Sequence, residues 1–271
     1  MNIRYPAVAG TFYPSEKSQL TGSIQSFLDK APMSQKGEPV GFIVPHAGYI
    51  YSGPVAAYAY KYLEKKEIKK VVILAPSHFV GFKELSICKF DSLETPYGIV
   101  NLSHEDISEL LKHEMIIRSN IGYDHEHSLE VQLPFLQHII KNSWEIIPIM
   151  MGHQTKETVN AASQILQYYI SNNIPVVISS DLSHYHSYEI AQNMDKKICN
   201  LMLTRDDKSL WKAFNDGEIE ACGFGPLLAM LEAIESFEDI SMELLDLRNS
   251  GDTAGPKDKV VGYCSMGFFK N

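Results

Sequence analysis

Histidine side chains follow three apolar, strand-like segments of this sequence. The three are His46, His78 and His184. In an open sheet of parallel strands, ligands bind in the crevice beyond the carboxyl ends of the strands, where an imidazole can serve as a metal ligand, an acid or a base. Pro45 and Pro76 lack a backbone N–H and end the strand ladder there. One such histidine alone is explained as a hydrogen-bonded loop residue, but three together favour a cleft that they share.

Asp181 stands three residues before His184, just after the strand-like segment. If the turn between them is helical, this spacing lets the carboxylate fix the tautomer of the imidazole. His184 would then act as an acid or a base. The alternative is that Asp181 caps the following helix. His186 alternates with His184, and we expect it on the surface.

A further histidine lies in the segment Glu126-His127-Ser128-Leu129-Glu130, which is predicted to open a helix. His127 and Glu130 then fall on one helix face at positions i and i+3. One interpretation is that they supply a metal ligand, an acid or a base. The other is that they only place charge in the first turn, where it interacts favourably with the helix dipole. His125 is a rival of His127, because spacing alone does not separate them.

Cys222 lies between Ala221 and Gly223, directly before an apolar helical segment. A helix N-terminus and any neighbouring cation would lower the pKa of its thiol, and the glycines on both sides of this helix start let another group approach closely. Buried cysteines are also common as inert core residues. We expect that role for the cysteines without this context, which are Cys88, Cys199 and Cys264.

Two neutral imidazoles and one anionic ligand, with open positions, form the pattern of a reactive metal centre. His46, His78 and Cys222 fit these three positions, with His184 and Asp181 beside them as the acid or base and its partner. A carboxylate as the anion suits non-haem Fe(II), whereas a thiolate favours iron, copper or zinc. Without a metal, Cys222, His184 and Asp181 form instead a Cys-His-Asp nucleophilic set.

An alternation of strands and helices must position these residues. Strands are expected at 40–44, 71–74, 145–149 and 175–179. Helices are expected at 54–65, 103–112, 129–141, 155–171, 188–204, 208–216 and 226–236. This alternation is typical of parallel strands joined by crossover helices. The sequence therefore predicts an α/β fold with a largely parallel central sheet flanked by helices, as a single domain over residues 1–271.

Two patterns concern the borders of these elements. Ser103 with Asp106 resembles a capping box and supports a helix start there. Near the C-terminus, 242–247 and 260–268 look like two strands joined by a segment rich in turn residues. We expect a hairpin-like or edge pair that closes the sheet.

The composition argues against several classes of partner. The formal net charge is −9, and the basic residues occur in short mixed groups, so no basic stripe is offered to nucleic acid. No apolar run approaches the roughly 18 to 20 residues that cross a bilayer, so we expect a soluble protein without a membrane partner. The absence of a CxxC motif and of a signal peptide indicates the cytoplasm.

Six segments together resemble the Memo family, and the resemblance extends over nearly the whole chain. They are RYPAVAGTFYP at 4–14, HAGY at 46–49, PSH at 76–78, EHSLE at 126–130, SSDLSH at 179–184 and ACG at 221–223. Each motif alone is weak, and their number and order carry the resemblance. Prokaryotic members of this family are labelled AmmeMemoRadiSam system protein B.

This resemblance implies a fold shared with class III extradiol ring-cleaving dioxygenases, which hold non-haem iron with two histidines and a glutamate. In Memo proteins a cysteine stands in place of the glutamate, and Cys222 matches it. By the same resemblance His46 and His78 are the histidine ligands, His184 corresponds to the catalytic base, and Asp181 lies beside it. A thiolate changes the charge donated to the iron and is itself oxidisable, so ring cleavage does not follow from the resemblance.

Three hypotheses of function result. The first is a metal-binding, dioxygenase-like protein with iron- or copper-dependent redox activity on an unknown small substrate, in which Fe2+ is expected and copper or zinc are alternatives. The second is a non-catalytic module for a peptide or another ligand, since eukaryotic members of the resembled family are described as binding phosphotyrosine peptides. The third is a metal-free Cys-His-Asp hydrolase. The resemblance also associates the protein with radical-SAM proteins.

Overall fold

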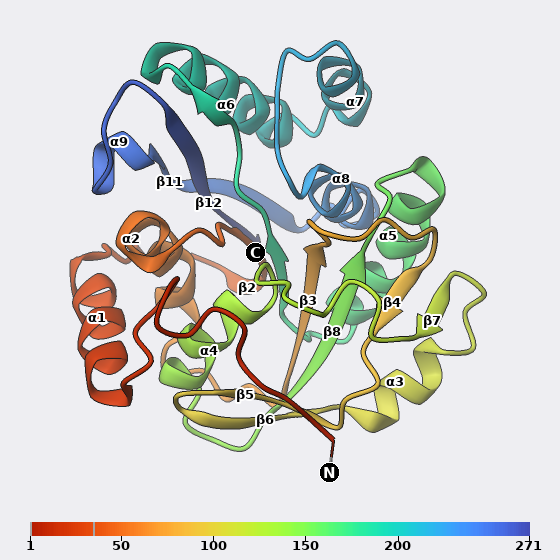
Figure 1. The fold of residues 1–271 in the computed structure, drawn as a ribbon. Helices are drawn as coiled ribbons and strands as arrows, with labels where there is room; N and C mark the ends of the chain where they lie inside the picture. The colour runs from red at the N-terminus through yellow and green to blue at the C-terminus, as the bar shows by residue number, and fades with distance from the viewer. Residues whose placement is uncertain (1, 35) are drawn as a thin grey trace.

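The computed structural model describes residues 2–34 and 36–271, and a mixed twelve-stranded sheet runs through them (Figure 1). Its central strands follow one another in the order β6, β8, β3, β9 and β2, and neighbours in this row are parallel. Their bounds are Gly98–Leu102, Glu145–Met151, Lys70–Pro76, Val176–Ser179 and Glu38–Val44. The predicted fold class, an α/β fold with a largely parallel central sheet flanked by helices, is confirmed.

The parallel strands are hydrophobic along nearly their whole length because both faces of the sheet are covered. In β3 every residue from Val71 to Pro76 is buried, and in β9 all four residues are. The four strand segments expected from the sequence are β2, β3, β8 and β9, and the structure confirms each of them. Their continuous apolar, β-branched runs are the reason that they could be found.

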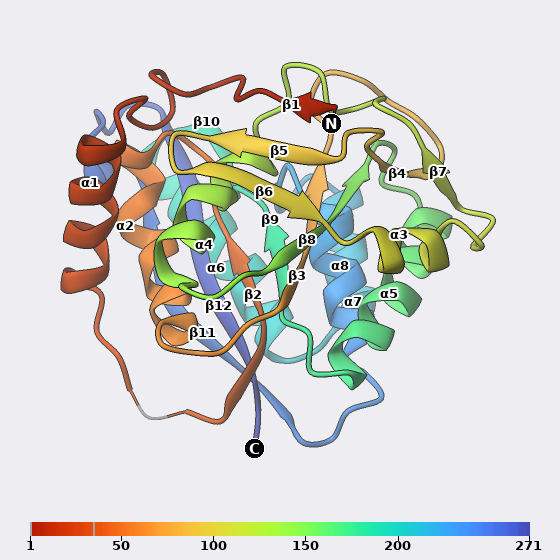
Figure 2. The ribbon, with the colours of Figure 1, turned by 90° about the horizontal axis from the view of Figure 1, so that it is seen from below.

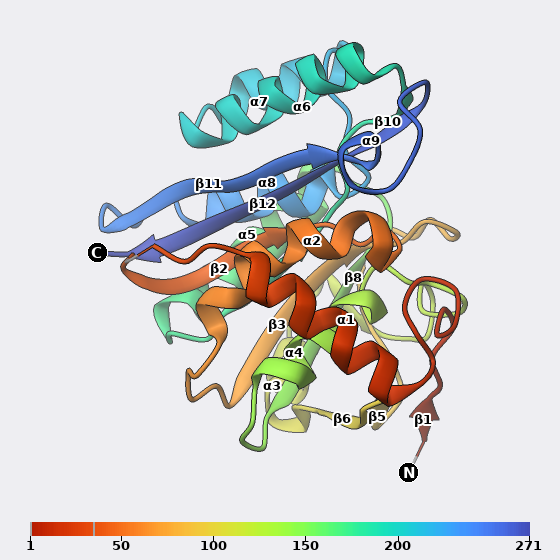
Figure 3. The ribbon, with the colours of Figure 1, turned by 90° about the vertical axis from the view of Figure 1, so that its left-hand side faces the viewer.

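Helices form a layer on each face of the sheet (Figures 2 and 3). On one side, α1 and α4 pack against α2, which contacts β2 and β12; on the other, α8 packs on β3 and β9, α5 on α8, and α6 on β11 and β12. The helices are α1 Lys17–Lys30, α2 Tyr49–Tyr60, α3 His104–Leu110, α4 Leu133–Ile139, α5 Lys156–Ser171, α6 Tyr188–Leu203, α7 Asp207–Asn215 and α8 Phe224–Ala233. No helix of the described residues is long and apolar enough to span a bilayer.

Two helix starts differ from the sequence-based expectation. Helix α2 begins at Tyr49, so Pro54, the expected first residue, lies in its second turn. The proline lacks a backbone N–H, and one hydrogen bond of the helix is therefore missing. The segment expected to be helical from residue 129 opens with a 3-10 helix, η2, at Glu130–Gln132, and α4 begins after it. Residues 126–129 therefore form no helical face.

The predicted capping box at the start of α3 is not formed. The Ser103 hydroxyl donates to the carboxylate of Asp106 at 2.5 Å and does not cap a backbone N–H of the helix. The same carboxylate lies 2.6 Å from Nζ of Lys70. Asp106 is thus drawn into an ion pair with the start of β3 and away from the helix terminus.

The C-terminal pair of strands is confirmed, but it is not simply an edge. Strands β11 (Ile240–Asn249) and β12 (Val260–Lys270) are antiparallel, and a short helix, α9 (Ser250–Thr253), lies between them. Strand β12 also pairs with β2 and with the short β10 (His184–His186). It is an interior strand that brings residues 260–263 beside the histidines that follow β9.

Short peripheral strands were not expected from the sequence. They are β1 Ile3–Arg4, β4 Leu85–Ile87, β5 Ser92–Thr95, β7 Ile116–Arg118 and β10, and β6 was likewise missed. All of them have only two to five residues, which is too short for a periodic pattern to stand out. They extend the sheet on its outer sides.

Candidate metal centre

The structure brings the three predicted ligands together at the carboxyl edge of the sheet. His46 follows β2, His78 follows β3, and Cys222 precedes α8. One ligand atom of each lies within 4.8 Å of the others, and Sγ of Cys222 is 3.2 Å from Nε2 of His46. These distances are short enough for a single ion to be shared among the three side chains.

A buried hydrogen-bond network fixes the ring of His46. The Ser179 hydroxyl donates to the Ser128 carbonyl at 2.6 Å, so its oxygen must accept from Nδ1–H of His46 at 2.8 Å. The same oxygen accepts from the side-chain amide of Gln132 at 2.8 Å. This arrangement assigns the proton to Nδ1 and leaves the lone pair of Nε2 directed at Cys222. Burial, reinforced by the neighbouring histidines, lowers the pKa of His46, so the ring is neutral.

A carboxylate orients His78 in the corresponding way. Glu126 accepts from Nδ1 of His78 at 2.9 Å and from its backbone N–H at 2.6 Å. It also accepts from the backbone N–H groups of His127 and Ser128. Burial alone would raise the pKa of Glu126, but these bonds, above all those with His78, hold it at about 2. Burial in turn opposes the charged form of His78, yet the bond to Glu126 outweighs it and raises the pKa of the ring.

The thiol of Cys222 lies against the chain that leaves β9. Its Sγ accepts from the backbone N–H of Asp181 at 3.2 Å. A Cβ atom on the next residue, Gly223, would come within 2.7 Å of the Ser179 carbonyl oxygen, so a glycine is needed for this approach. Burial, with the Asp181 carboxylate adding to it, raises the pKa of the thiol. The expectation that the helix terminus lowers this pKa is wrong, because desolvation is the larger effect.

Asp181 does not contact His184 in the predicted way. The chain from Ser180 to Ser183 is not helical, so the spacing of three does not place the two side chains on one face. The carboxylate of Asp181 instead accepts from the backbone N–H of His46 at 2.7 Å. Burial raises the pKa of Asp181 to about 7, although that hydrogen bond works in the opposite direction.

His184 has a different acidic neighbour, Glu220, which sequence reasoning missed. Nδ1 of His184 lies 3.9 Å from Oε1 of Glu220, and the His184 backbone N–H is 3.4 Å from Oε2. Nε2 of His186, expected on the surface, is 2.8 Å from the same carboxylate. The contact of Glu126 with His78 and that of Glu220 with His186 join residues at least 34 positions apart, so no local pattern could have revealed them.

Of the two rival histidines, the structure places His127 in the site. Its ring stacks on that of His78 with centroids 4.8 Å apart and planes 8° from parallel. Burial lowers the pKa of His127 to about 4. His125 is exposed. Glu130, expected on the same face as His127, is buried and binds Arg4 at 2.8 Å, so it holds the N-terminal segment instead.

A cavity of about 620 Å³ opens onto this centre. Its lining residues include His46, His78, His127, Asp181 and His184, the aromatic residues Phe12, Tyr51, Phe79, Tyr185 and Tyr263, and Lys259. All the predicted site residues except Cys222 line it directly, and Cys222 contacts Nε2 of His46. A small organic molecule in the cavity would therefore meet both aromatic rings and imidazoles.

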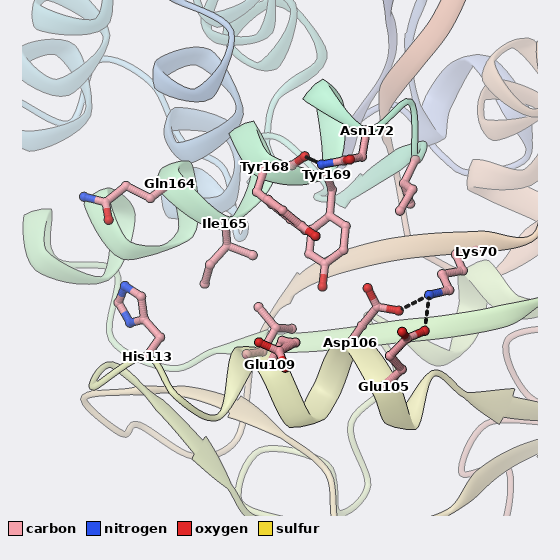
Figure 4. A pocket seen from close by; sticks show the side chains of 12 residues that line it. Lys70, Glu105, Asp106, Glu109, His113, Gln164, Ile165, Tyr168, Tyr169 and Asn172 are labelled. Atoms are coloured by element: carbon pink, nitrogen blue, oxygen red, sulfur yellow. Dashed lines mark hydrogen bonds and ion pairs between the residues drawn. The ribbon is translucent and has the colours of Figure 1, made fainter.

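A second cavity, of about 450 Å³, lies between α3 and α5, beside the first residue of β3 (Figure 4). Lys70 pairs there with Asp106 at 2.6 Å and with Glu105 at 3.4 Å. In Figure 4 the Tyr169 hydroxyl points toward Asp106. None of the residues predicted to do chemistry lies in this cavity, and its buried charges are already paired.

Comparisons with known proteins agree with the resemblance seen in the sequence. The model of the Memo-like protein family matches residues 4–267. A MEMO1 family protein of Sulfurisphaera tokodaii is 36% identical over 282 residues, covering 98% of this chain and 99% of the relative. Another, of Nitrosopumilus maritimus, is 34% identical over 276 residues, with 98% and 99% covered.

One of the solved structures with a similar fold covers most of this chain. It is that of the uncharacterized protein JW3007 from Escherichia coli K12, with a TM-score of 0.59, 11% identity, and coverage of 84% of this chain and 98% of that one. At this identity the likeness concerns the fold alone, whereas the relatives above match in sequence from end to end. The predicted family is therefore confirmed, and this chain belongs to the Memo-like protein family.

Proposed function

We propose that this chain is a metal-binding, dioxygenase-like protein with redox activity on a small organic molecule, and that His46, His78 and Cys222 hold iron (Fe2+) or copper. The observation that carries the proposal is the meeting of three ligand atoms within 4.8 Å, from segments that are far apart in the chain. A cavity beside the ligands offers room for the molecule on which the centre acts.

The donor set fits such a metal. The site offers two imidazoles, each with Nδ1 bonded within the protein, and one thiol. Such ligands suit iron, copper or zinc. Each imidazole is oriented from behind, His46 by Ser179 and His78 by Glu126, as is usual for histidines that bind metals. A bound cation would also reverse the raised thiol pKa, because coordination deprotonates a cysteine.

The chain's own residues would move protons at the bound molecule. Burial lowers the pKa of His127 and of His184, so both rings are neutral near pH 7 and can accept a proton. Asp181 lines the same cavity, and its backbone N–H donates to Sγ of Cys222. The metal, when bound, would supply Lewis acidity and electron transfer. The aromatic rings that line the cavity would hold the molecule and keep water away from the centre.

The other two hypotheses have less support. The Cys-His-Asp hydrolase requires Asp181 to orient His184, but Asp181 binds the backbone of His46, and Cys222 contacts His46. A peptide-binding module remains compatible with the open, aromatic cavity, but it gives no role to the converging ligand atoms. Peptide binding that survives replacement of His46 and Cys222 would favour it.

Metal analysis of protein purified without oxygen, stripped and then reconstituted, tests the proposal. We expect close to one iron or copper ion per chain, and a loss of affinity greater than about 10-fold in Cys222→Ala. Cys88→Ala, which changes a buried cysteine that belongs to neither group of candidate ligands, is the matched control and keeps the metal. Equal metal binding by Cys222→Ala and the unmodified protein would contradict the proposal. Zinc as the resident ion would remove its redox part.

A further inference from the structure

Tyr185 adopts a backbone conformation that residues with a side chain rarely adopt. Its φ is +61°, in the left-handed region that favours glycine. The residue lies in β10, where the pairing with β12 is irregular: His184 is opposite Val261 and His186 is opposite Val260. Tyr185 is thus the extra residue of a β-bulge, and bulges of this kind redirect a side chain.

The fold gains little from this unfavourable conformation. The side chain of Tyr185 is 71% exposed, and the aromatic contact of its ring is with His184, at a centroid distance of 6.0 Å. The residue lines the cavity beside the candidate metal centre. A strained residue that packs poorly and faces a site points to a role in binding.

A second exposed ring faces the same cavity from another strand. Phe79 follows β3 and is 63% exposed. In the sheet, β3 and β10 are separated by β9, β2 and β12, so the two rings approach the cavity from different sides. Exposed aromatic rings are costly in water and bind flat, unsaturated groups well.

The charges at the cavity indicate the ligand's other feature. Lys259 lines the cavity, and the ion pairs among the described residues do not include it. The carboxylate among the lining residues, that of Asp181, is buried and accepts from the backbone N–H of His46. An anionic group on the ligand would therefore be stabilised beside Lys259 and disfavoured beside Asp181.

We propose that Tyr185 is a specificity-determining residue, whose strained backbone holds its ring, with that of Phe79, against the aromatic ring of a small organic anion whose charge meets Lys259. This inference rests on the proposed function only in using the same cavity. It does not depend on which metal is bound. It predicts that the ring contact contributes to ligand affinity and not to the stability of the fold.

The inference is tested by binding of three probes to the full chain: benzoate, cyclohexanecarboxylate and benzyl alcohol. Benzoate has both ring and charge, and each of the others lacks one of them. We expect benzoate to bind more tightly than either, by about two- to tenfold for the ring, measured by ligand-observed NMR titration. No binding of benzoate, or no preference over cyclohexanecarboxylate, would overturn the inference.

Variants separate a binding role from a structural one. We expect Tyr185→Gly to lose the preference for benzoate over cyclohexanecarboxylate, while its melting temperature is unchanged or higher because glycine accepts this φ. Tyr185→Phe should keep the preference, and Tyr168→Ala, which changes an exposed tyrosine at the other cavity, should have no effect. Unchanged benzoate binding by Tyr185→Gly would show that the bulge serves only to place the neighbouring histidines.

The same samples distinguish failure of this inference from failure of the proposed function. Metal content of Tyr185→Gly is expected to equal that of the unmodified protein, because no ligand atom is touched. A normal metal content with no ring preference would refute the inference alone. A ring preference in a chain that binds no iron or copper would refute the proposed function alone.

Discussion

His46 and His78 each use one ring nitrogen for a hydrogen bond within the protein, and the other nitrogen is thereby left for a metal. For His46 the partner is an uncharged hydroxyl, that of Ser179, whereas for His78 it is the carboxylate of Glu126. The two rings therefore differ in basicity: burial and the neighbouring histidines lower the pKa of His46, while Glu126 raises that of His78 against the effect of burial. The role of Glu126 is thus to orient and to polarise one ligand.

Replacing this carboxylate is expected to weaken metal binding without removing a ligand. In Glu126→Gln the side chain loses an acceptor that holds His78, and the metal affinity should fall by about 10- to 100-fold, measured by competition with a chromophoric chelator. Glu220→Gln is the matched control, since Glu220 contacts His184 and His186. An equal loss of affinity in both variants would show that Glu126 has no specific role.

Asp195 provides a prediction for the dependence of stability on pH. It is buried on α6 and accepts from the Ser183 backbone N–H at 3.1 Å, and burial raises its pKa from 3.8 to about 6. The folded state therefore holds this proton more tightly than the unfolded chain, and its stabilising effect is lost as the pH rises from about 4 to 6. Asn has the same shape and does not titrate.

Urea unfolding of Asp195→Asn at several pH values measures this effect. Relative to the unmodified protein, the variant should become more stable by about 1 to 3 kcal/mol between pH 4 and pH 7. Stripping both proteins with chelator beforehand removes any contribution from metal. A difference in the free energy of unfolding that does not change with pH would contradict the prediction.

At the scale of elements, the site depends on how closely β12 and α6 approach each other. Gly262 of β12 exchanges backbone hydrogen bonds with Leu182 and Ser183, the residues just before His184. A Cβ atom on Gly262 would lie 2.0 Å from the carboxylate of Asp195. The absence of a side chain there lets the strand hold the loop that carries His184.

Gly262→Ala should therefore destabilise the fold, by about 1 to 3 kcal/mol, because the buried carboxylate must move. Gly22→Ala is the matched control: no atom lies within 4 Å of the Cβ position there, within α1, so alanine should stabilise the helix by about 0.5 to 1 kcal/mol. Thermal or urea unfolding of the two variants measures both changes in the free energy of unfolding, the expected loss in Gly262→Ala and the expected gain in Gly22→Ala. A neutral Gly262→Ala would mean that β12 and α6 separate at little cost.

Some elements could be predicted from the sequence and others could not, for physical reasons. The buried strands β2, β3, β8 and β9 have continuous apolar runs, which few other structures can accommodate. Strand β10 has only three residues, His-Tyr-His, and it forms because β12 lies beside it. The predicted contact between Asp181 and His184 is wrong for the same reason. Strand β12 holds this segment extended, whereas an isolated chain could form a helical turn there.

At the scale of the molecule, the parallel sheet collects residues that are remote in sequence. Cys222 and His46 are 176 positions apart, and no spacing rule connects them. Their meeting was anticipated because several strands end in reactive side chains, and because the order of the motifs resembles a known family. The acidic partners Glu126 and Glu220 could not be anticipated, since only the folded chain brings them to the histidines.

The central claim is that one ion is shared by two imidazoles and the sulfur of Cys222. X-ray absorption spectroscopy of the bound iron or copper identifies the atoms that coordinate the ion. The protein is reconstituted without oxygen for this measurement. We expect one sulfur and two imidazole nitrogens around the ion, with the sulfur contribution lost in Cys222→Ser. The absence of sulfur among the ligands, or the same ligands in Cys222→Ser and in the unmodified protein, would show that Cys222 does not bind the ion.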